Sequence, residues 1–345
     1  MSSNVFLDAG VVLAAGVMQG LFAVPMKYAK RWQYENIWLI FAVSGLVVFP
    51  WFLTLLTIPH IAEIYRATPE RTLVAVIGFG ICWGTGATLT GLALNMLGIG
   101  LAMAIVLGLS ASVGSLIPLL VLTPEKLATE QGRLYLAGTA VMLLGIVLAS
   151  YAGALRDRRT RMKTASLTEN AAGKKSFIAG LLIATFAGLF SSSLNFVYAF
   201  GSAALDEAQR AGVSPVWMSN VIAAPAVSGG FIANALYCGY LLRRNRTVAN
   251  FFWRDSRINW FFGALMGALW FGGQALYGLG VYRMGAFGTV IGWPLLMGTI
   301  IVTSNFAGLF TGEWAGSERR ALLYLGIGVT IILIALYVLS LARQA

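Results

Sequence analysis

The sequence contains one glycine-rich passage twice: Trp83-Gly84-Thr85-Gly86-Ala87-Thr88-Leu89-Thr90-Gly91-Leu92 and Trp270-Phe271-Gly272-Gly273-Gln274-Ala275-Leu276-Tyr277-Gly278-Leu279. The offset between the copies is 187 residues, and it still holds between Gly98 and Gly285. Both copies lie inside long apolar runs. Many secondary transporters consist of two such copies, which move against each other around a central site. The passage therefore predicts a membrane transporter rather than a soluble fold.

The composition is that of a chain embedded in lipid. Of the 345 residues, 58% are hydrophobic and only 11% are charged, and the mean hydropathy is +0.79. All 13 carboxylates lie between apolar runs or at their ends, as expected where a charge at the membrane centre costs about 2.5–3.5 kcal/mol. The net charge of +11 is explained by basic loops, so membrane lipid is expected as a partner and nucleic acid is not.

The apolar runs predict an all-α integral membrane protein. A transmembrane helix needs about 20 apolar residues. Ten runs meet this length, at residues 6–28, 35–57, 72–95, 99–123, 132–154, 176–203, 215–242, 257–282, 286–311 and 319–341.

The order of these runs predicts two inverted five-helix repeats. Residues 1–155 form the first repeat, 156–175 a basic linker, and 176–345 the second repeat. Because five is odd, the second repeat must enter the membrane from the opposite side. Smaller echoes, such as Gly20-Leu21-Phe22 and Gly188-Leu189-Phe190, follow the same order.

The positive charges predict the orientation. Loops after the odd-numbered helices hold 17 of the 24 lysines and arginines. Positively charged loops stay in the cytoplasm. We therefore expect both termini outside a bacterial inner membrane and the linker inside.

Enzymatic chemistry is not indicated. His60 is the only histidine, and no cluster has the spacing of metal ligands. The chain also lacks a glycine-rich Lys-Ser/Thr loop for nucleotide phosphates. We expect no enzyme activity, no metal and no cofactor.

Uncharged polar side chains within the spans are the first candidates for a substrate site. They include Gln19, Asn195 and Gln274. An amide both donates and accepts hydrogen bonds, so it suits the hydroxyls of a neutral polyol. The same amides also suit hydrogen bonding between helices, and the sequence leaves both roles open.

Aromatic residues and glycines complete the candidate substrate site. Flat apolar faces for the C–H side of a sugar ring are offered by Trp83, Trp270, Tyr277 and Trp293. The glycines of the two passages narrow the helices and are predicted hinges: Gly86, Gly91, Gly273 and Gly278.

Proton coupling requires a titrating group. No carboxylate lies at mid-membrane, so the candidates near helix ends are Glu35, Glu207 and Glu313, with Lys27 at the end of the first helix. Lys27 lies in the substrate path or extends to the interface. We expect Glu35, close by in the sequence, to pair with Lys27.

Several motifs resemble those of bacterial L-rhamnose–proton symporters, a family of the drug/metabolite transporter superfamily. The motifs extend over nearly the whole chain: Pro25-Met26-Lys27-Tyr28-Ala29-Lys30-Arg31-Trp32, Trp83-Gly84-Thr85-Gly86, Gly188-Leu189-Phe190-Ser191, Gly212-Val213-Ser214-Pro215, Ile291-Gly292-Trp293 and Glu313-Trp314. The resemblance implies ten helices in two inverted halves and uptake of a 6-deoxyhexose with a proton. Ala87, Asn95 and Leu296 depart from the family pattern, so the sugar stays open between L-rhamnose and a related deoxysugar.

Two other functions compete with sugar uptake. An exporter or exchanger of amino acids or other metabolites would share the fold, but it needs charged partners for its substrate. A sensor or scaffold that transports nothing usually carries a soluble domain, and the longest polar stretch here is only about twenty residues.

Overall fold

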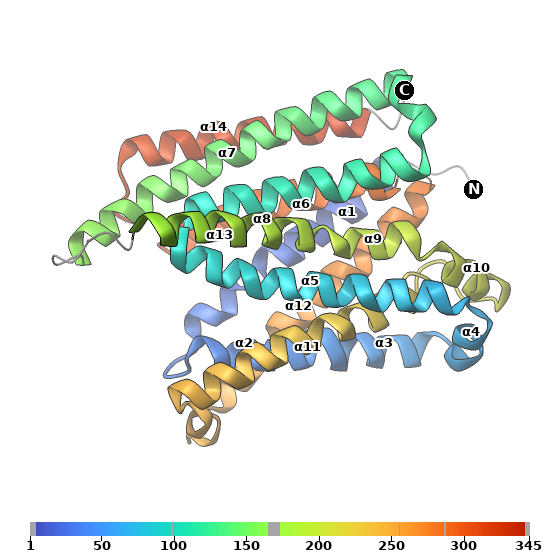
Figure 1. Ribbon diagram of the computed structural model, residues 1–345, viewed down its shortest axis with the longest axis horizontal. Helices are drawn as coiled ribbons and strands as arrows, with labels where there is room; N and C mark the ends of the chain where they lie inside the picture. Colours follow the sequence, from blue (N-terminus) through green and yellow to red (C-terminus); the bar gives the residue numbers. More distant parts are fainter. Residues whose placement is uncertain (1–4, 98, 165–172, 255, 286–287, 342–345) are drawn as a thin grey trace.

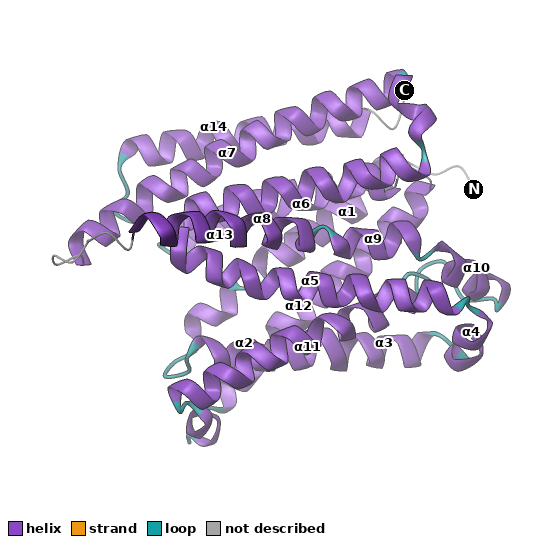
Figure 2. Ribbon diagram, viewed as in Figure 1, coloured by secondary structure: helices purple, strands orange, loops and turns teal. Residues whose placement is uncertain are grey.

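A computed structural model describes residues 5–97, 99–164, 173–254, 256–285 and 288–341. This part of the chain is helical and contains no strand (Figure 2). Ten of its helical segments are long and apolar enough to cross a membrane. The expectation of an all-α membrane protein with ten spans is confirmed.

The first five spans end near Arg156. Their helices are α1 (Val5–Leu21) continued by the 3₁₀ helix η1 (Val24–Tyr28), α2 (Tyr34–Val43) continued by the π-helix η2 (Ser44–Val48) and α3 (Phe49–Thr57), α5 (Glu70–Leu97), α6 (Ile99–Leu122) and α7 (Glu130–Thr164). The second five are α8 (Gly173–Ser191) continued by α9 (Ser193–Phe200) and α10 (Ser202–Arg210), α11 (Asn220–Asn245), α12 (Arg257–Met284), α13 (Gly288–Phe310) and α14 (Arg319–Leu341). Short connecting helices are α4 (Ile61–Ala67), η3 (Pro124–Ala128) and η4 (Val248–Phe252). Of the predicted linker, residues 165–172 lie outside the described residues.

Local chemistry accounts for the departures from regular helix. Pro25 lies in the first turn of η1, where a missing N–H costs least. Pro50 has no N–H to donate to the carbonyl of Leu46, and the wider turns of η2 precede it. The sixth span is interrupted at Ser192, whose hydroxyl donates to the carbonyl of Leu189 at 2.5 Å.

The helices lie side by side along one direction (Figure 1). α1 begins and α14 ends at the same end of the bundle. We call the other end, where η1, η4 and the turn between α13 and α14 lie, the Lys27 end. α7 packs against α14 at one side, away from α2 and α11. α5 contacts α8 and α11, and α12 contacts α1 and α2, so the two copies of the glycine-rich passage lie centrally.

Candidate functional site

The two copies of the glycine-rich passage meet through their tryptophans. Trp83 on α5 stacks on Trp270 on α12, with ring centroids 4.9 Å apart and planes inclined at 24°. Phe41 and Trp270 form a T-shaped pair with ring centroids 6.2 Å apart. A Cβ atom on Gly230 of α11 would lie 2.6 Å from Cε3 of Trp83, so this glycine makes room for the indole.

A chain of buried hydrogen bonds runs from the first span to the sixth. Gln19 on α1 donates through Nε2 to Oε1 of Gln274 at 2.8 Å. Gln274 in turn donates through Nε2 to the hydroxyl of Tyr198 on α9 at 2.9 Å. Gln274 has no exposed surface, and Gln19 and Tyr198 are both 6% exposed. The three side chains carry no charge, and they connect helices from both ends of the sequence.

A second group of bonds is centred on Asn195. Its Oδ1 accepts from the hydroxyl of Tyr277 at 2.5 Å, and its Nδ2 donates to the carbonyls of Gly114 (2.7 Å) and Thr289 (2.9 Å). The Trp293 ring lies edge to face with Tyr277, at a centroid distance of 5.6 Å. The ring of Tyr277 also meets that of Tyr198 at 5.2 Å, which places the two groups in contact.

The interruption of the sixth span positions Asn195. α8 ends at Ser191 and α9 begins at Ser193, and the N–H of Asn195 donates to the carbonyl of Ser192 at 3.0 Å. Interrupted helices at mid-membrane are typical of transporter binding sites, because loosened backbone is tolerated only beside a cavity or other protein.

Sequence reasoning missed Tyr198 and Ser219 as parts of this region, and it counted Asn220 among the intramembrane amides without assigning it to the substrate site. Tyr198 follows Asn195 by three residues and so shares its helix face, a spacing that could have identified it. Ser219 lies beside Tyr198: a Cβ on Gly278 would contact both side chains. The hydroxyl of Ser219 and both amide atoms of Asn220 are buried without a hydrogen-bond partner among the described residues. Buried polar groups of this kind indicate places for water or ligand.

The predicted hinge glycines lie within unbroken helices. A Cβ on Gly86 would come within 3.0 Å of α8, and one on Gly273 would come within 2.8 Å of α1. A Cβ on Gly278 would lie against Ser219, whereas nothing lies within 4 Å of a Cβ on Gly91. In this conformation three of the four glycines allow helices to approach closely, and their role as hinges stays a prediction.

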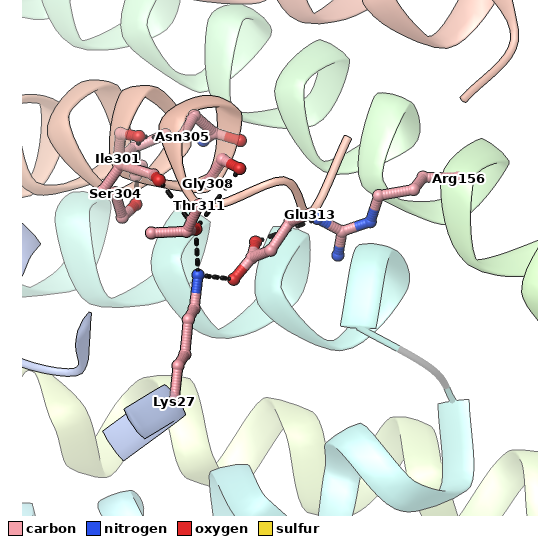
Figure 3. Close-up of polar contacts among 9 residues, drawn as sticks. Lys27, Arg156, Ile301, Ser304, Asn305, Gly308, Thr311 and Glu313 are labelled. Atoms are coloured by element: carbon pink, nitrogen blue, oxygen red, sulfur yellow. Dashed lines mark hydrogen bonds and ion pairs between the residues drawn. The ribbon is translucent and has the colours of Figure 1, made fainter. Parts of the chain in front are cut away.

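Two of the predicted titrating groups meet at the Lys27 end. Glu313, just after α13, forms an ion pair with Lys27 of η1. Its other oxygen accepts from Nη1 of Arg156 on α7 at 3.3 Å (Figure 3). The ammonium of Lys27 also donates to the hydroxyl of Thr311 at 2.5 Å, and the guanidinium of Arg156 lies 4.9 Å from the ring centroid of Trp314. Three spans are thereby joined at their ends.

A pocket of about 230 Å³ lies beside this ion pair. Its lining includes Gly20, the neighbour of Gln19, as well as Ser304 and Asn305 of α13. Lys27, Arg156 and Glu313 also line it. The pocket therefore extends from the ends of α1, α7 and α13 to the last turn of α1.

The expected pairing of Lys27 with Glu35 is wrong. Glu35 is 2% exposed, and it accepts instead from Nδ2 of Asn245 at 3.0 Å and from the hydroxyl of Thr247 at 2.7 Å. Asn245 is the last residue of α11 and Thr247 comes shortly after it, so Glu35 joins the second span to the seventh. Glu207, on α10 at the opposite end of the bundle, accepts from Arg210 at 2.5 Å.

The described residues contain no group of three or more His, Cys, Asp or Glu side chains placed to hold a metal ion. Of the positions that depart from the family pattern, Leu296 is fully buried. The side chain of Asn95 lies outside the described residues.

Comparisons with known proteins identify the family of this chain. A model of the L-rhamnose-proton symport protein (RhaT) family matches residues 1–345. An L-rhamnose-proton symporter of Shigella dysenteriae serotype 1 (strain Sd197) is 27% identical over 347 residues, which cover 97% of each chain. The L-rhamnose-proton symporter of Escherichia coli (strain SMS-3-5) is also 27% identical, over 342 residues and 97% of each chain. The chain belongs to the L-rhamnose-proton symport protein family, a family of transporters rather than enzymes.

Proposed function

We propose that this protein is a secondary transporter that takes up L-rhamnose or a related deoxysugar together with a proton. Its family membership over the whole chain supports this reaction. The observation that carries the proposal is the continuous buried path of uncharged hydrogen-bonding groups from Gln19 through Gln274 to Tyr198. Neutral amides and hydroxyls match the hydroxyls of a sugar, and burial excludes competing water.

The substrate binds between the two halves in this proposal. The amides of Gln19, Asn195 and Gln274 exchange their present hydrogen bonds for bonds to sugar hydroxyls. Ser219 and Asn220 supply polar atoms that have no hydrogen-bond partner among the described residues. Aromatic faces from Trp83, Trp270, Tyr277 and Trp293 cover the apolar side of the ring. An amino acid would need charged partners, and these buried contacts consist of uncharged groups.

We also propose two five-helix repeats related by a two-fold axis in the membrane plane, as in the drug/metabolite transporter fold. Contacts of equivalent glycines support it. Gly86 on α5 packs on α8, and Gly273, 187 residues later on α12, packs on α1. Gly20 on α1 packs on α13, and Gly188 on α8 packs on α6. In each pair the partner helices are exchanged between halves, as a two-fold axis requires.

The Lys27 end faces the cytoplasm in this proposal, and both termini lie outside. Support comes from the positive charges. The last turn of α11, with Arg243, and the start of α14, with Arg319, lie at the same end of the bundle as Lys27 and Arg156.

Glu313 is the proposed proton-coupling group. Its charge holds Lys27 and Arg156 together beside the pocket at the Lys27 end. Protonation would remove that charge, release Lys27 and free the ends of α1 and α13 to separate. Glu35 and Glu207 are less suited, because the residues that bond them, Asn245 and Thr247 for Glu35 and Arg210 for Glu207, do not line this pocket.

Uptake by proteoliposomes tests the function. Vesicles that contain the purified protein are given an inward proton gradient and radiolabelled L-rhamnose, with and without a protonophore. We expect accumulation above the external concentration, abolished by the protonophore and reduced by an excess of another deoxysugar but not by amino acids. The proposal would be contradicted if no deoxysugar accumulated although a thermal-shift assay showed that the purified protein binds ligand and is therefore active.

A further inference from the structure

A second pocket opens at the Lys27 end, away from the buried amides. Its volume is about 630 Å³. It lies between η1, the segment after it, η4 and the start of α12. The lining residues are Lys27, Tyr28, Lys30, Arg31, Trp32, Asn250, Trp253, Ser256, Ile258, Asn259 and Phe262.

The lining of this pocket is positively charged. Three cations, Lys27, Lys30 and Arg31, come from five consecutive residues, and the lining includes no carboxylate among the described residues. Lys27 is neutralised by Glu313. Neither Lys30 nor Arg31 has a carboxylate partner in the described part of the chain. Two cations that face one pocket without such a partner favour an anionic ligand. Binding of a neutral sugar would not require them.

The segment that carries these cations is held in place by the protein itself. Asn259 of α12 donates through Nδ2 to the carbonyl of Lys30 at 2.8 Å and accepts from its N–H at 3.3 Å. The next residue, Arg31, has the left-handed backbone angle φ of 63°, and its guanidinium lies 4.2 Å from the ring centroid of Trp253. Trp32 donates through Nε1 to the carbonyl of Asn250 at 3.0 Å. The segment is therefore fixed before any ligand arrives.

Exposed apolar side chains lie beside the pocket. Ile258, which lines it, is 51% exposed, and Phe252 and Phe261, each next in sequence to a lining residue, are 84% and 58% exposed. These residues flank the start of the span Arg257–Met284, at the level where a membrane-spanning helix meets the headgroup region. Aromatic residues gather at this level, and lysines and arginines beside it attract anionic lipids.

We propose that this pocket binds the phosphate of an anionic phospholipid in the leaflet at the Lys27 end. Lys30 and Arg31 bond the phosphate oxygens, and the acyl chains lie along Ile258 and Phe261. The amides of Asn250 and Asn259 and the hydroxyl of Ser256 are the polar groups available to the rest of the headgroup. A headgroup here would also approach Lys27, which lines both this pocket and the one beside Glu313.

Native mass spectrometry of the purified full-length protein tests this site. The delipidated protein is titrated with phosphatidylglycerol, with zwitterionic phosphatidylethanolamine and, separately, with inorganic phosphate. We expect phosphatidylglycerol to be retained at concentrations at which the other two are not. The variant Lys30→Gln/Arg31→Gln should weaken phosphatidylglycerol binding by about 25-fold, which corresponds to about 1 kcal/mol for each cation.

The matched control is Arg254→Gln/Arg257→Gln. It removes two exposed charges at the same end of the molecule, from residues that do not line the pocket, and should leave binding unchanged. Trp253→Ala removes only the ring beneath Arg31 and should weaken binding severalfold, which keeps the test informative if the double variant does not fold. Equal binding by all variants would overturn the proposal. Equal affinity for inorganic phosphate would assign the pocket to free phosphate and likewise overturn the lipid assignment.

Discussion

Trp83 stacks on Trp270, the residue that occupies the same place in the second copy of the glycine-rich passage. Two equivalent positions of a duplicated unit can touch only where the axis that relates the copies passes between them. The stacked pair therefore marks the centre of the proposed symmetry. Any movement of one half against the other must change this contact directly.

Loss of the stacked pair should impair transport more than a change in ring size. Trp270→Ala removes the stacking partner of Trp83, whereas Trp270→Phe keeps an aromatic face. An aromatic pair contributes about 0.5–1.5 kcal/mol beyond its buried area, so we expect the alanine variant to raise KM for uptake by up to about tenfold. The phenylalanine variant should stay within about twofold to threefold of the native protein. Equal kinetics of both variants would place the pair outside the substrate path.

Removal of the unpaired polar groups should separate binding from stability. Asn220 and Ser219 have no hydrogen-bond partner in the described structure, so Asn220→Ala and Ser219→Ala should leave the thermal midpoint nearly unchanged and raise KM. Asn195 differs, because its amide bonds two carbonyls and the Tyr277 hydroxyl. Asn195→Ala should lower the free energy of unfolding by about 1–3 kcal/mol. Thermal unfolding in detergent, measured beside uptake, distinguishes the two classes, and unchanged uptake by both partnerless variants would exclude them as sugar ligands.

Neutralisation of Glu313 should uncouple transport from protons. Glu313→Gln removes the charge that holds Lys27 and Arg156. We expect this variant to lose accumulation driven by a pH gradient and to retain exchange of labelled for unlabelled sugar across the membrane. Glu207→Gln, which disturbs only the exposed pair with Arg210 at the other end, is the control and should keep both activities. Gradient-driven accumulation by Glu313→Gln would remove Glu313 from the coupling mechanism.

A methyl group at Gly230 should destabilise the bundle. The new Cβ would lie 2.6 Å from Cε3 of Trp83 and 3.1 Å from the carbonyl oxygen of Gly80. Overpacking of this kind costs about 1–3 kcal/mol. Gly78→Ala on the neighbouring α5 provides the control, because nothing lies within 4 Å of its Cβ position. A thermal midpoint of Gly230→Ala equal to that of Gly78→Ala would contradict the packing of Trp83 described above.

The fold was accessible from the sequence because lipid enforces a simple pattern. Every span must satisfy its backbone internally, so runs of about 20 apolar residues identify helices and their number. The interruption at Ser192 and the wide turns of η2 were not accessible in the same way. Both are local departures within uniformly apolar runs, and hydropathy does not register them.

The sequence identified candidate site residues where they lie in the duplicated passage. Trp83, Trp270 and Gln274 all lie in the repeated glycine-rich passage. Tyr198 was missed because a tyrosine in an apolar run looks like an ordinary aromatic residue. The partner of Lys27 was mistaken because nearness in sequence favoured Glu35, whereas the ion pair joins residues 27 and 313 across the folded bundle.

The hydrogen bonds among Gln19, Gln274 and Tyr198 have a consequence for affinity. Each sugar hydroxyl that bonds one of these three side chains must displace an internal hydrogen bond of similar strength. At these groups only the difference between the old and the new bonds contributes to the binding free energy of the sugar. Such a carrier binds its sugar with low affinity and releases it quickly on the other side of the membrane. The contacts that limit affinity therefore also raise turnover.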